Sequence, residues 1–294
     1  MSMDMSVRLL KGDGPTLFLR QIAPNAAKAT ILFVHGSMVH SEYYMPFALR
    51  LAALGYGTVL CDLRGHGRSD GVRGHVGSFH HHVDDVLRVV EALGQTTSPL
   101  YLGGESYGAL VAWAAYERMP ESARLQGMLM VSPALRLRIT LAPWQRIGLQ
   151  GLARAWPRFR SPTAMTLAGV STHPDIDELV RRDPLLCRRY TVGFFVNLLS
   201  AEEAILRLPE PRVPVLSVLA SNDLVIDTEA SREFLGRLKP PSRMAVIPDS
   251  LHGLCSDRSQ DIAGLFQAWV GSQGPSDRLA VHAGLRPWGG GDGA

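Results

Sequence analysis

Residues 100–110 read Leu-Tyr-Leu-Gly-Gly-Glu-Ser-Tyr-Gly-Ala-Leu. An apolar run typical of a strand leads into a Gly-x-Ser-x-Gly pentapeptide, and an apolar run typical of a helix, Ala109 to Met119, follows it. A serine on so tight a strand-to-helix turn is forced into a strained backbone conformation that presents its hydroxyl. The two glycines are needed because side chains at 104 and 108 would collide where strand and helix close together. The sequence therefore predicts Ser106 as a nucleophile.

A serine hydroxyl is a weak nucleophile at neutral pH, so it needs a base, and the base needs an orienting acid. Asp223 follows an apolar strand predicted over 214–220, and α/β sheets build their sites at such strand ends. His252 lies in the loop after a shorter strand predicted over 244–248. The chain order of nucleophile, acid and histidine is the one associated with α/β-hydrolases. Asp227 is the alternative acid, because either aspartate could instead cap the helix that follows.

A fourth element of the predicted site lies near the N-terminus, where an apolar strand over 29–34 ends in His35-Gly36-Ser37-Met38. Acyl transfer creates a negatively charged tetrahedral oxygen, which backbone N–H groups aimed at it in advance stabilise. One donor is expected from Tyr107, the residue after the nucleophile, and the other from this loop. Ser37 is the predicted second donor and Met38 the next choice. A simple glycine turn without a role in catalysis is the alternative interpretation.

Further segments extend the pattern over most of the chain. They are His40-Ser-Glu-Tyr-Tyr44, Asp62 to Gly71, His75 to Phe79 and Asp183 to Arg188. With them, the chain from about residue 10 to 270 resembles the monoglyceride lipase and lysophospholipase branch of the serine α/β-hydrolases. The resemblance implies that Ser106, Asp223 and His252 form a catalytic triad, and that Ser37 and Tyr107 form the oxyanion hole.

The same resemblance implies a carboxylic ester hydrolase that cleaves lipids with a single acyl chain, such as monoacylglycerol, through an acyl-enzyme. It implies no metal and no organic cofactor, and a small lipid or ester as the binding partner. Three alternatives stay open: a lysophospholipase, an acyltransferase on the same triad, and a ligand-binding protein of hydrolase fold without turnover. An aspartate nucleophile, as in dehalogenases and epoxide hydrolases of this fold, is disfavoured by the serine at 106.

The distribution of strand and helix patterns predicts the architecture. Between Ile31 and Val131 strands without polar alternation are separated by helices, which is typical of a parallel sheet covered on both faces. Gly12-Asp13-Gly14 indicates a hairpin before them. After Ser132 the pattern is helical until about Leu208. We expect an α/β-hydrolase fold with a mostly parallel central sheet and helices on both faces. Its predicted parts are a core of 1–132 and 209–270, a helical cap or lid of 133–208 inserted after the sixth strand, and a disordered tail of 271–294.

Composition narrows the class of protein further. A chain of 294 residues with 46% hydrophobic residues can bury a large core. The sequence contains no apolar run of membrane-spanning length, and its first residues do not form a secretory signal. Cys61, Cys187 and Cys255 have no metal-site spacing and indicate reduced, mostly buried thiols of a cytoplasmic protein. The net charge of +3 gives no reason to expect nucleic acid as a partner.

Two charged or polar features invite other interpretations. Residues 133–208 contain eleven arginines, no lysine and six acids. An apolar cap bordered by arginines is suited to peripheral contact with anionic lipid, although a solvated helix face is the alternative. His80-His81-His82 suggests a metal site. Successive helix residues point about 100° apart, however, so a solvated position at the start of a helix is preferred for all three.

Overall fold

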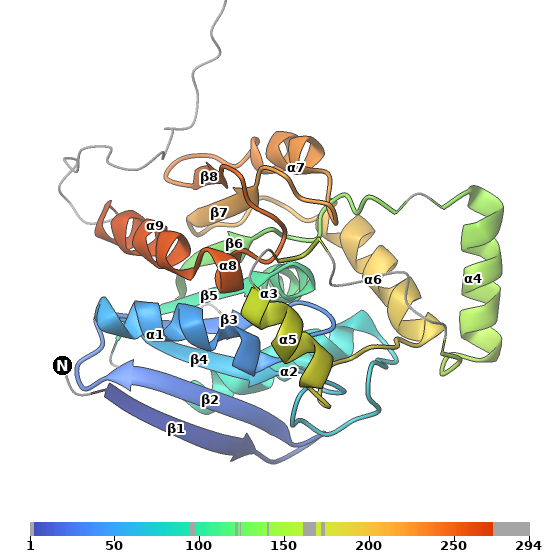
Figure 1. The fold of residues 1–294 in the computed structure, drawn as a ribbon, viewed down its shortest axis with the longest axis horizontal. Coiled ribbons are helices and arrows are strands. Elements are labelled where there is room, and N and C mark those ends of the chain that lie inside the picture. The colour runs from blue at the N-terminus through green and yellow to red at the C-terminus, as the bar shows by residue number, and fades with distance from the viewer. Residues whose placement is uncertain are drawn as a thin grey trace, which may run out of the picture.

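The computed structural model describes residues 3–94, 98–120, 123, 125–139, 141–160, 169–171 and 174–272, so nearly all of the predicted tail lies outside it. Its described strands form one eight-stranded sheet in the order β1-β2-β4-β3-β5-β6-β7-β8 (Figure 1). The strands are β1 (Met3–Leu10), β2 (Leu17–Pro24), β3 (Thr30–Val34), β4 (Gly57–Asp62), β5 (Leu100–Glu105), β6 (Leu125–Val131), β7 (Val215–Ala220) and β8 (Arg243–Ile247). The pairs β1–β2 and β2–β4 are antiparallel, and the pairs from β4 to β8 are parallel. The predicted hairpin and mostly parallel sheet are therefore confirmed.

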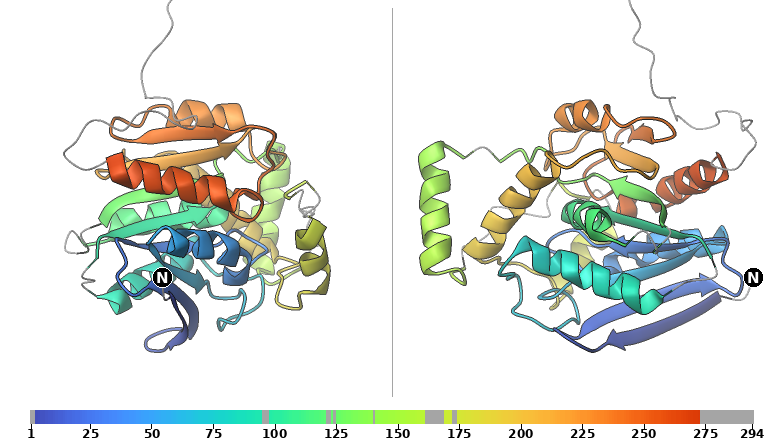
Figure 2. Two further views of the ribbon diagram at one scale, coloured as in Figure 1. Left: turned by 60° about the vertical axis from the view of Figure 1, so that its left-hand side comes forward. Right: turned by 180° about the vertical axis from the view of Figure 1, so that it is seen from behind.

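Helices cover both faces of this sheet, as the apolar strands between Ile31 and Val131 predict (Figure 2). The core helices are α1 (Met45–Ala53), α2 (Phe79–Leu93), α3 (Tyr107–Arg118), α7 (Thr228–Leu235), α8 (Leu254–Asp257) and α9 (Ser259–Ser272). Side chains of α1, α8 and α9 share one apolar cluster with one face of the sheet. Side chains of α2, α3 and α7 share a second cluster with the opposite face. The parallel part of the sheet is thereby buried between two layers of helices.

Local chemistry sets where these helices begin and end. Ser78 caps α2 by accepting a hydrogen bond from the N–H of His80, and Gly94 ends the helix with a positive φ of 62°. Helix α1 begins at Met45, because the residues before it, Ser41–Tyr44, form a short 3₁₀ turn. The helix after the pentapeptide begins at Tyr107 rather than Ala109, since Ser106 itself occupies the cap position.

Between β6 and β7 the described residues contain three helices: α4 (Pro143–Ala155), α5 (Pro174–Arg182) and α6 (Val192–Ile205). This is the predicted helical insertion after the sixth strand. Helix α6 is anchored to the core through Phe194 and Leu198. Helix α4 stands away from the sheet at one side of the molecule and has no buried residue (Figures 1 and 2). An ion pair of 2.5 Å between Arg146 and Glu203 ties it to α6.

Candidate active site

Ser106 lies at the junction of β5 and α3, with φ 56° and ψ −120°. This positive φ is an unfavourable conformation for a residue with a side chain, and it is held by the surrounding contacts. The N–H of Ser106 donates to Val131 O, and its carbonyl accepts from the N–H of Ala134. A Cβ at Gly104 would collide with the backbone of Gly108, which is the close approach that the sequence predicts. The turn therefore has room only for glycine at that position.

The second glycine is required by a contact that the pentapeptide itself does not reveal. A Cβ at Gly108 would collide with the carbonyls of Val34 and His35 at the end of β3. The first turn of α3 thus lies directly against the loop that carries the predicted oxyanion donor. A Cβ added at Gly36 in that loop would lie 3.4 Å from the Cβ of Ser106. The nucleophile candidate and the loop are consequently packed together.

Asp223 and His252 are brought together from the ends of β7 and β8. His252 Nδ1 lies 2.7 Å from Asp223 Oδ2, and both residues are buried. The other carboxylate oxygen, Oδ1, accepts from the N–H groups of Val225 and Ile226 at 2.8 and 3.0 Å. These two donors favour a carboxylate, so Nδ1 carries the proton that is donated to it. His252 Nε2 is then the basic nitrogen of the ring.

Asp227, the alternative acid, has a different role in the structure. Its side chain accepts from the N–H of Ala230 at 3.0 Å and caps α7. The geometry therefore separates the two aspartates that the sequence left as candidates: Asp223 contacts the histidine, and Asp227 satisfies the start of a helix.

The basic nitrogen of His252 is buried and has no hydrogen-bond partner among the described residues. The hydrogen bonds of these residues include none between it and the hydroxyl of Ser106. The loop that carries His252 is fixed at the next residue, where the N–H of Gly253 donates to Val170 O of the cap at 2.7 Å. An unpaired basic nitrogen in a buried position is suited to accept a proton from a reacting group.

The two predicted oxyanion donors have free N–H groups as far as the described residues show. Tyr107 is the first residue of α3, where backbone N–H groups have no acceptor inside the helix. No backbone hydrogen bond within the described ranges is donated by Ser37. The second choice, Met38, is engaged, since its N–H donates to the hydroxyl of Tyr190. The geometry therefore favours Ser37 over Met38.

A buried glutamate that the sequence did not single out connects three loops of this site. Glu105 Oε2 accepts from the hydroxyl of Tyr44 at 2.9 Å, and Oε1 accepts from the N–H of Cys255 at 2.9 Å. The same tyrosine oxygen accepts from the N–H of Gly36 at 2.8 Å. Burial raises the pKa of Glu105, while the nearby His252 acts to lower it. The glutamate thus links the oxyanion loop, the serine turn and the histidine loop.

Three buried histidines form a second group that the sequence did not identify. Burial is the largest cause that lowers the pKa of His35 to about 3, of His66 to about 4, and of His82 well below its usual value. His82 Nδ1 forms a hydrogen bond of 2.8 Å with Tyr107 Oη, and the His82 ring packs beside the ring of His66. The expectation of a solvated position was therefore wrong for this residue. It fails because α2 turns one histidine of the triplet into the core while His80 stays exposed.

No group of three or more potential metal-ligating side chains is arranged to hold an ion within the described part of the chain. All three cysteines are free and buried, as expected from their apolar surroundings. Burial raises the pKa of the Cys187 thiol to about 11, which makes it a poor nucleophile. None of the helices among the described residues has the length and apolarity needed to cross a bilayer.

The insertion between β6 and β7 contacts the site directly. The N–H of Cys187 donates to Met38 O at 2.8 Å, one residue from the proposed oxyanion donor. The carboxylate of Asp183 accepts from the hydroxyl of Tyr43 at 3.0 Å and lies 2.8 Å from His40 Nε2. These bonds explain why the sequence around 183–188 and 40–44 carries polar residues at positions that are buried.

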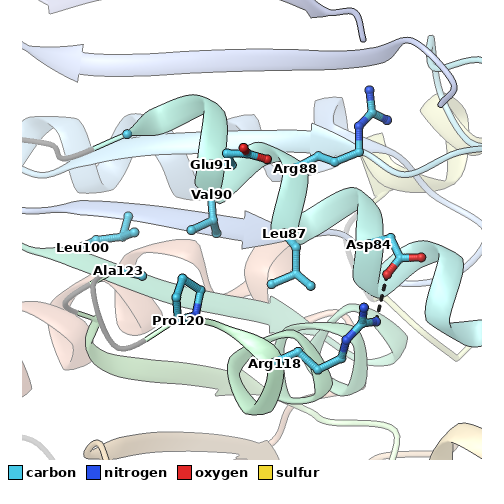
Figure 3. A pocket seen from close by; sticks show the side chains of 10 residues that line it. Asp84, Leu87, Arg88, Val90, Glu91, Leu100, Arg118, Pro120 and Ala123 are labelled. Carbon is cyan, nitrogen blue, oxygen red and sulfur yellow. Dashed lines mark ion pairs between the residues drawn. The ribbon is translucent and has the colours of Figure 1, made fainter. Parts of the chain in front are cut away.

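A surface hollow of about 570 Å³ lies elsewhere, between α2 and α3 (Figure 3). Leu100, the first residue of β5, lines it, whereas Ser106 follows the last residue of that strand. An ion pair of 2.8 Å between Arg118 and Asp84 crosses the hollow (Figure 3). It therefore lies at the opposite end of the sheet from the candidate site and takes no part in it.

The fold and the strained serine turn define an α/β-hydrolase. The model of the family described as serine aminopeptidase, S33, matches residues 25–259, and the chain belongs to that family. The human monoglyceride lipase is 29% identical over 229 residues, which are 76% of this chain and 75% of the relative. Phospholipase YtpA of Bacillus subtilis (strain 168) is 28% identical over 203 residues, 68% of this chain and 77% of the relative.

Solved structures agree with this assignment of the fold. The monoacylglycerol lipase of Paleococcus ferrophilus superposes with a TM-score of 0.77 at 23% identity and covers 88% of this chain and 99% of its own. A soluble variant of the Saccharomyces cerevisiae monoglyceride lipase, in complex with a substrate analog, gives 0.78 at 18% identity and covers 92% and 96%. The predicted resemblance and fold class are confirmed. Family and relatives together support an enzyme, a carboxylic ester hydrolase, as the sequence predicts.

Proposed function

We propose that this protein is a serine hydrolase that cleaves the ester of lipids with one acyl chain, with monoacylglycerol as the preferred class. The observation that carries the proposal is the 2.7 Å contact between His252 and Asp223, combined with the strained, glycine-flanked Ser106. A buried imidazole with one nitrogen fixed by a carboxylate and the other unpaired has the arrangement of an acid–base catalyst.

In the proposed mechanism, His252 Nε2 takes the proton of Ser106 as its oxygen attacks the ester carbonyl. Asp223 holds the ring by its other nitrogen and stabilises the positive charge that develops on it. The N–H groups of Ser37 and Tyr107 receive the oxyanion. His252 then gives its proton to the departing alcohol, which leaves an acyl-enzyme on Ser106. The same nitrogen activates water to release the fatty acid.

The lipid class is supported by the names of the relatives and by the cap. Two relatives that share at least two thirds of their length with this chain are named for lipid esters, a monoglyceride lipase and a phospholipase. The insertion packs against the oxyanion loop through Tyr190 and Cys187, so a substrate must enter beside an apolar cover. Such a site accommodates one acyl chain more readily than three.

The decisive experiment is hydrolysis of a panel of monoacylglycerols, lysophospholipids and p-nitrophenyl esters of graded chain length. Ser106→Ala is expected to abolish turnover and labelling by a fluorophosphonate, with an unchanged circular dichroism spectrum. Asp223→Asn should lower turnover by roughly 10⁴-fold because the imidazole loses its orienting acceptor. Asp227→Asn is the matched control and should keep turnover, since this carboxylate only caps a helix. Normal turnover in either of the first two variants would exclude the proposal.

A lysophospholipid substrate is the second candidate, because a relative of similar identity is named a phospholipase. The panel separates the two by the ratio of kcat/KM for monoacylglycerol and for lysophospholipid of equal chain length. Product analysis in the presence of competing alcohols distinguishes acyl transfer from hydrolysis. Absence of turnover on every ester of the panel would favour a ligand-binding protein.

Peripheral contact with membranes is proposed for α4. Trp144 and Ile147 on this helix are 73% and 70% exposed, and Trp156, which follows it, is 67% exposed. Large apolar side chains in such positions partition into the boundary between head groups and acyl chains, and Arg154 beside them can meet anionic lipid.

Co-sedimentation with vesicles of neutral and of anionic lipid tests this contact. Trp144→Ser combined with Ile147→Ser should weaken binding to both kinds of vesicle. Val72→Ser, a change at an exposed apolar residue outside the insertion, is the matched control. Equal binding to neutral and anionic vesicles would exclude an electrostatic contribution of the arginine to membrane contact. Unchanged binding by the double variant would exclude a contribution of the exposed apolar side chains.

A further inference from the structure

The first strand, β1, is an open edge of the sheet. It pairs with β2 on one side, and no other described strand pairs with it (Figure 1). Seven of its eight residues are exposed. A long strand with unpaired N–H and C=O groups is a template for pairing with another strand unless it is interrupted or covered. Residues 3–10 contain no proline and no bulge in their ladder with β2.

This open edge also carries an apolar face. Met3, Met5, Val7 and Leu9 alternate along β1 and are 43%, 56%, 58% and 53% exposed. Their direct neighbours on β2 are Pro24, Ile22, Arg20 and Phe18, and cross-strand neighbours share one face. Ile22 is buried in the cluster that packs against α1. The exposed apolar row of β1 therefore lies on the same face of the sheet as this cluster, beyond the last helix that covers that face.

The other face of β1 carries two opposite charges, Asp4 and Arg8, two residues on either side of Ser6. Neither forms an ion pair with any described residue. If a second copy of the strand runs antiparallel with Ser6 opposite Ser6, each Asp4 faces the Arg8 of the other copy. A shift by two residues in either direction places both charges opposite serine or leucine instead. Only one register of β1 with itself is thus complementary in charge.

The same register matches the apolar face. Met3 then lies opposite Leu9, and Met5 lies opposite Val7, with all eight apolar side chains of two copies on one face of the joined sheet. Cβ atoms of directly opposite residues lie about 4.5–5.5 Å apart, so these side chains shield one another from water. Shifts by one residue would set apolar residues opposite charged ones and turn one row to the wrong face.

We propose that β1 is a self-association surface, on which a second copy of this chain docks by antiparallel pairing about a two-fold axis through Ser6. The two eight-stranded sheets then continue into one another. The axis passes through the outer edge of the sheet, whereas Ser106 follows β5, with β2, β4 and β3 between them. The association leaves the candidate active sites of both copies independent, so it does not rest on the proposed ester hydrolysis.

Charge reversal tests the register directly. Sedimentation velocity of the full chain at about 1 to 100 µM should show a concentration-dependent dimer. Asp4→Arg and Arg8→Asp each set like charges opposite each other at two places. Each variant alone should weaken the dimer at least about tenfold, since like charges opposite each other destabilise a strand pair.

A general loss of structure in the single variants could not be reversed by combining them, so recovery of the dimer in a double variant tests the register itself. The double variant Asp4→Arg/Arg8→Asp should dimerise again, because the arginine introduced at position 4 then faces the aspartate introduced at position 8 of the other copy. An equimolar mixture of the two single variants should form heterodimers for the same reason. Asp13→Arg, an equal charge change in the exposed turn after β1, is the control and should dimerise normally. Val7→Lys tests the apolar face and should give monomers.

Four results would overturn the proposal. They are a wild type that stays monomeric at about 100 µM, single variants that dimerise as the wild type does, a double variant that stays monomeric, and a dimer insensitive to Val7→Lys. Ester turnover and circular dichroism of each variant serve as readouts of folding. Because residues 3–10 lie outside the candidate site, a protein that hydrolyses no ester can still pass this test, and an active enzyme can still fail it.

Discussion

Replacement of Glu105 by alanine provides the sharpest test of how the candidate site is held together. The substitution removes both acceptor oxygens of a buried carboxylate. The hydroxyl of Tyr44 and the N–H of Cys255 then face no acceptor at their present distances of 2.9 Å. A buried donor left without its partner costs about 1–3 kcal/mol, so two such donors cost about 2–6 kcal/mol. Removing a buried charge returns part of its desolvation cost, and the lower half of that interval is therefore expected.

Urea unfolding at pH 7.5, followed by tryptophan fluorescence, measures this loss of free energy. Glu105→Ala should shift the midpoint to lower urea with an unchanged slope. Glu105→Gln keeps one acceptor oxygen but sets an amide N–H₂ against the second donor, so it should lose roughly half as much. Glu91→Ala, on the exposed surface of α2, is the control and should change stability by at most about 0.5 kcal/mol.

A Glu105→Ala variant whose stability lies within about 0.5 kcal/mol of the wild type would contradict this expected loss. A glutamine variant that is less stable than the alanine variant would contradict it as well. Ester turnover adds an independent readout. The loop at Gly36 and the first turn of α8 at Cys255 both lose a hydrogen bond that holds them. A displacement of about 1 Å at a reacting group can cost about 10²-fold in rate.

Three further predictions concern other parts of the site. The folded-state pKa values of His35 and His66, and that of His82, lie below the 6.5 of the unfolded chain, so the unfolded state binds more protons as the pH falls. The stabilisation by these neutral histidines should therefore be complete above pH 6.5. The free energy of unfolding should fall towards pH 4 by up to about 1.4 kcal/mol per pH unit for each histidine. Urea midpoints that do not change between pH 7 and 5 would contradict this prediction. Tyr190→Phe should lower stability by about 1–3 kcal/mol by leaving the N–H of Met38 unpaired, and should slow ester turnover because the loop of the proposed oxyanion donor is loosened; unchanged turnover would argue against that link. Gly104→Ala should give little folded protein in a solubility assay, since its Cβ meets backbone atoms that cannot move aside, and a soluble, active variant would show that the turn can open.

Short-range signals in the sequence predicted much of this structure. The strands between Ile31 and Val131 are apolar without polar alternation, and they lie in the parallel part of the sheet, as this pattern predicts. The chain order of serine, aspartate and histidine identified residues of which two lie in contact. Such features depend on neighbours in the chain, so a single sequence is enough to recognise them.

Long-range contacts account for what the sequence did not reveal. Glu105 finds its partners 61 and 150 residues away, and nothing in its local pattern indicates that it is buried. The direction of His82 depends on how α2 rotates against α3, where Tyr107 meets it. The choice between Asp223 and Asp227 likewise required the position of His252. These are properties of packing between elements, which periodicity cannot express.

The bonds from Cys187 and Tyr190 to Met38 have a consequence for protein engineering. Replacing the insertion between β6 and β7 with that of another hydrolase would exchange the residues that contact the candidate site. In this molecule the segment around 187–190 also holds the backbone beside Ser37 in place through hydrogen bonds to Met38. A chimera that exchanges only α4 and α5 keeps these hydrogen bonds. A chimera that replaces the whole insertion has to supply equivalent ones.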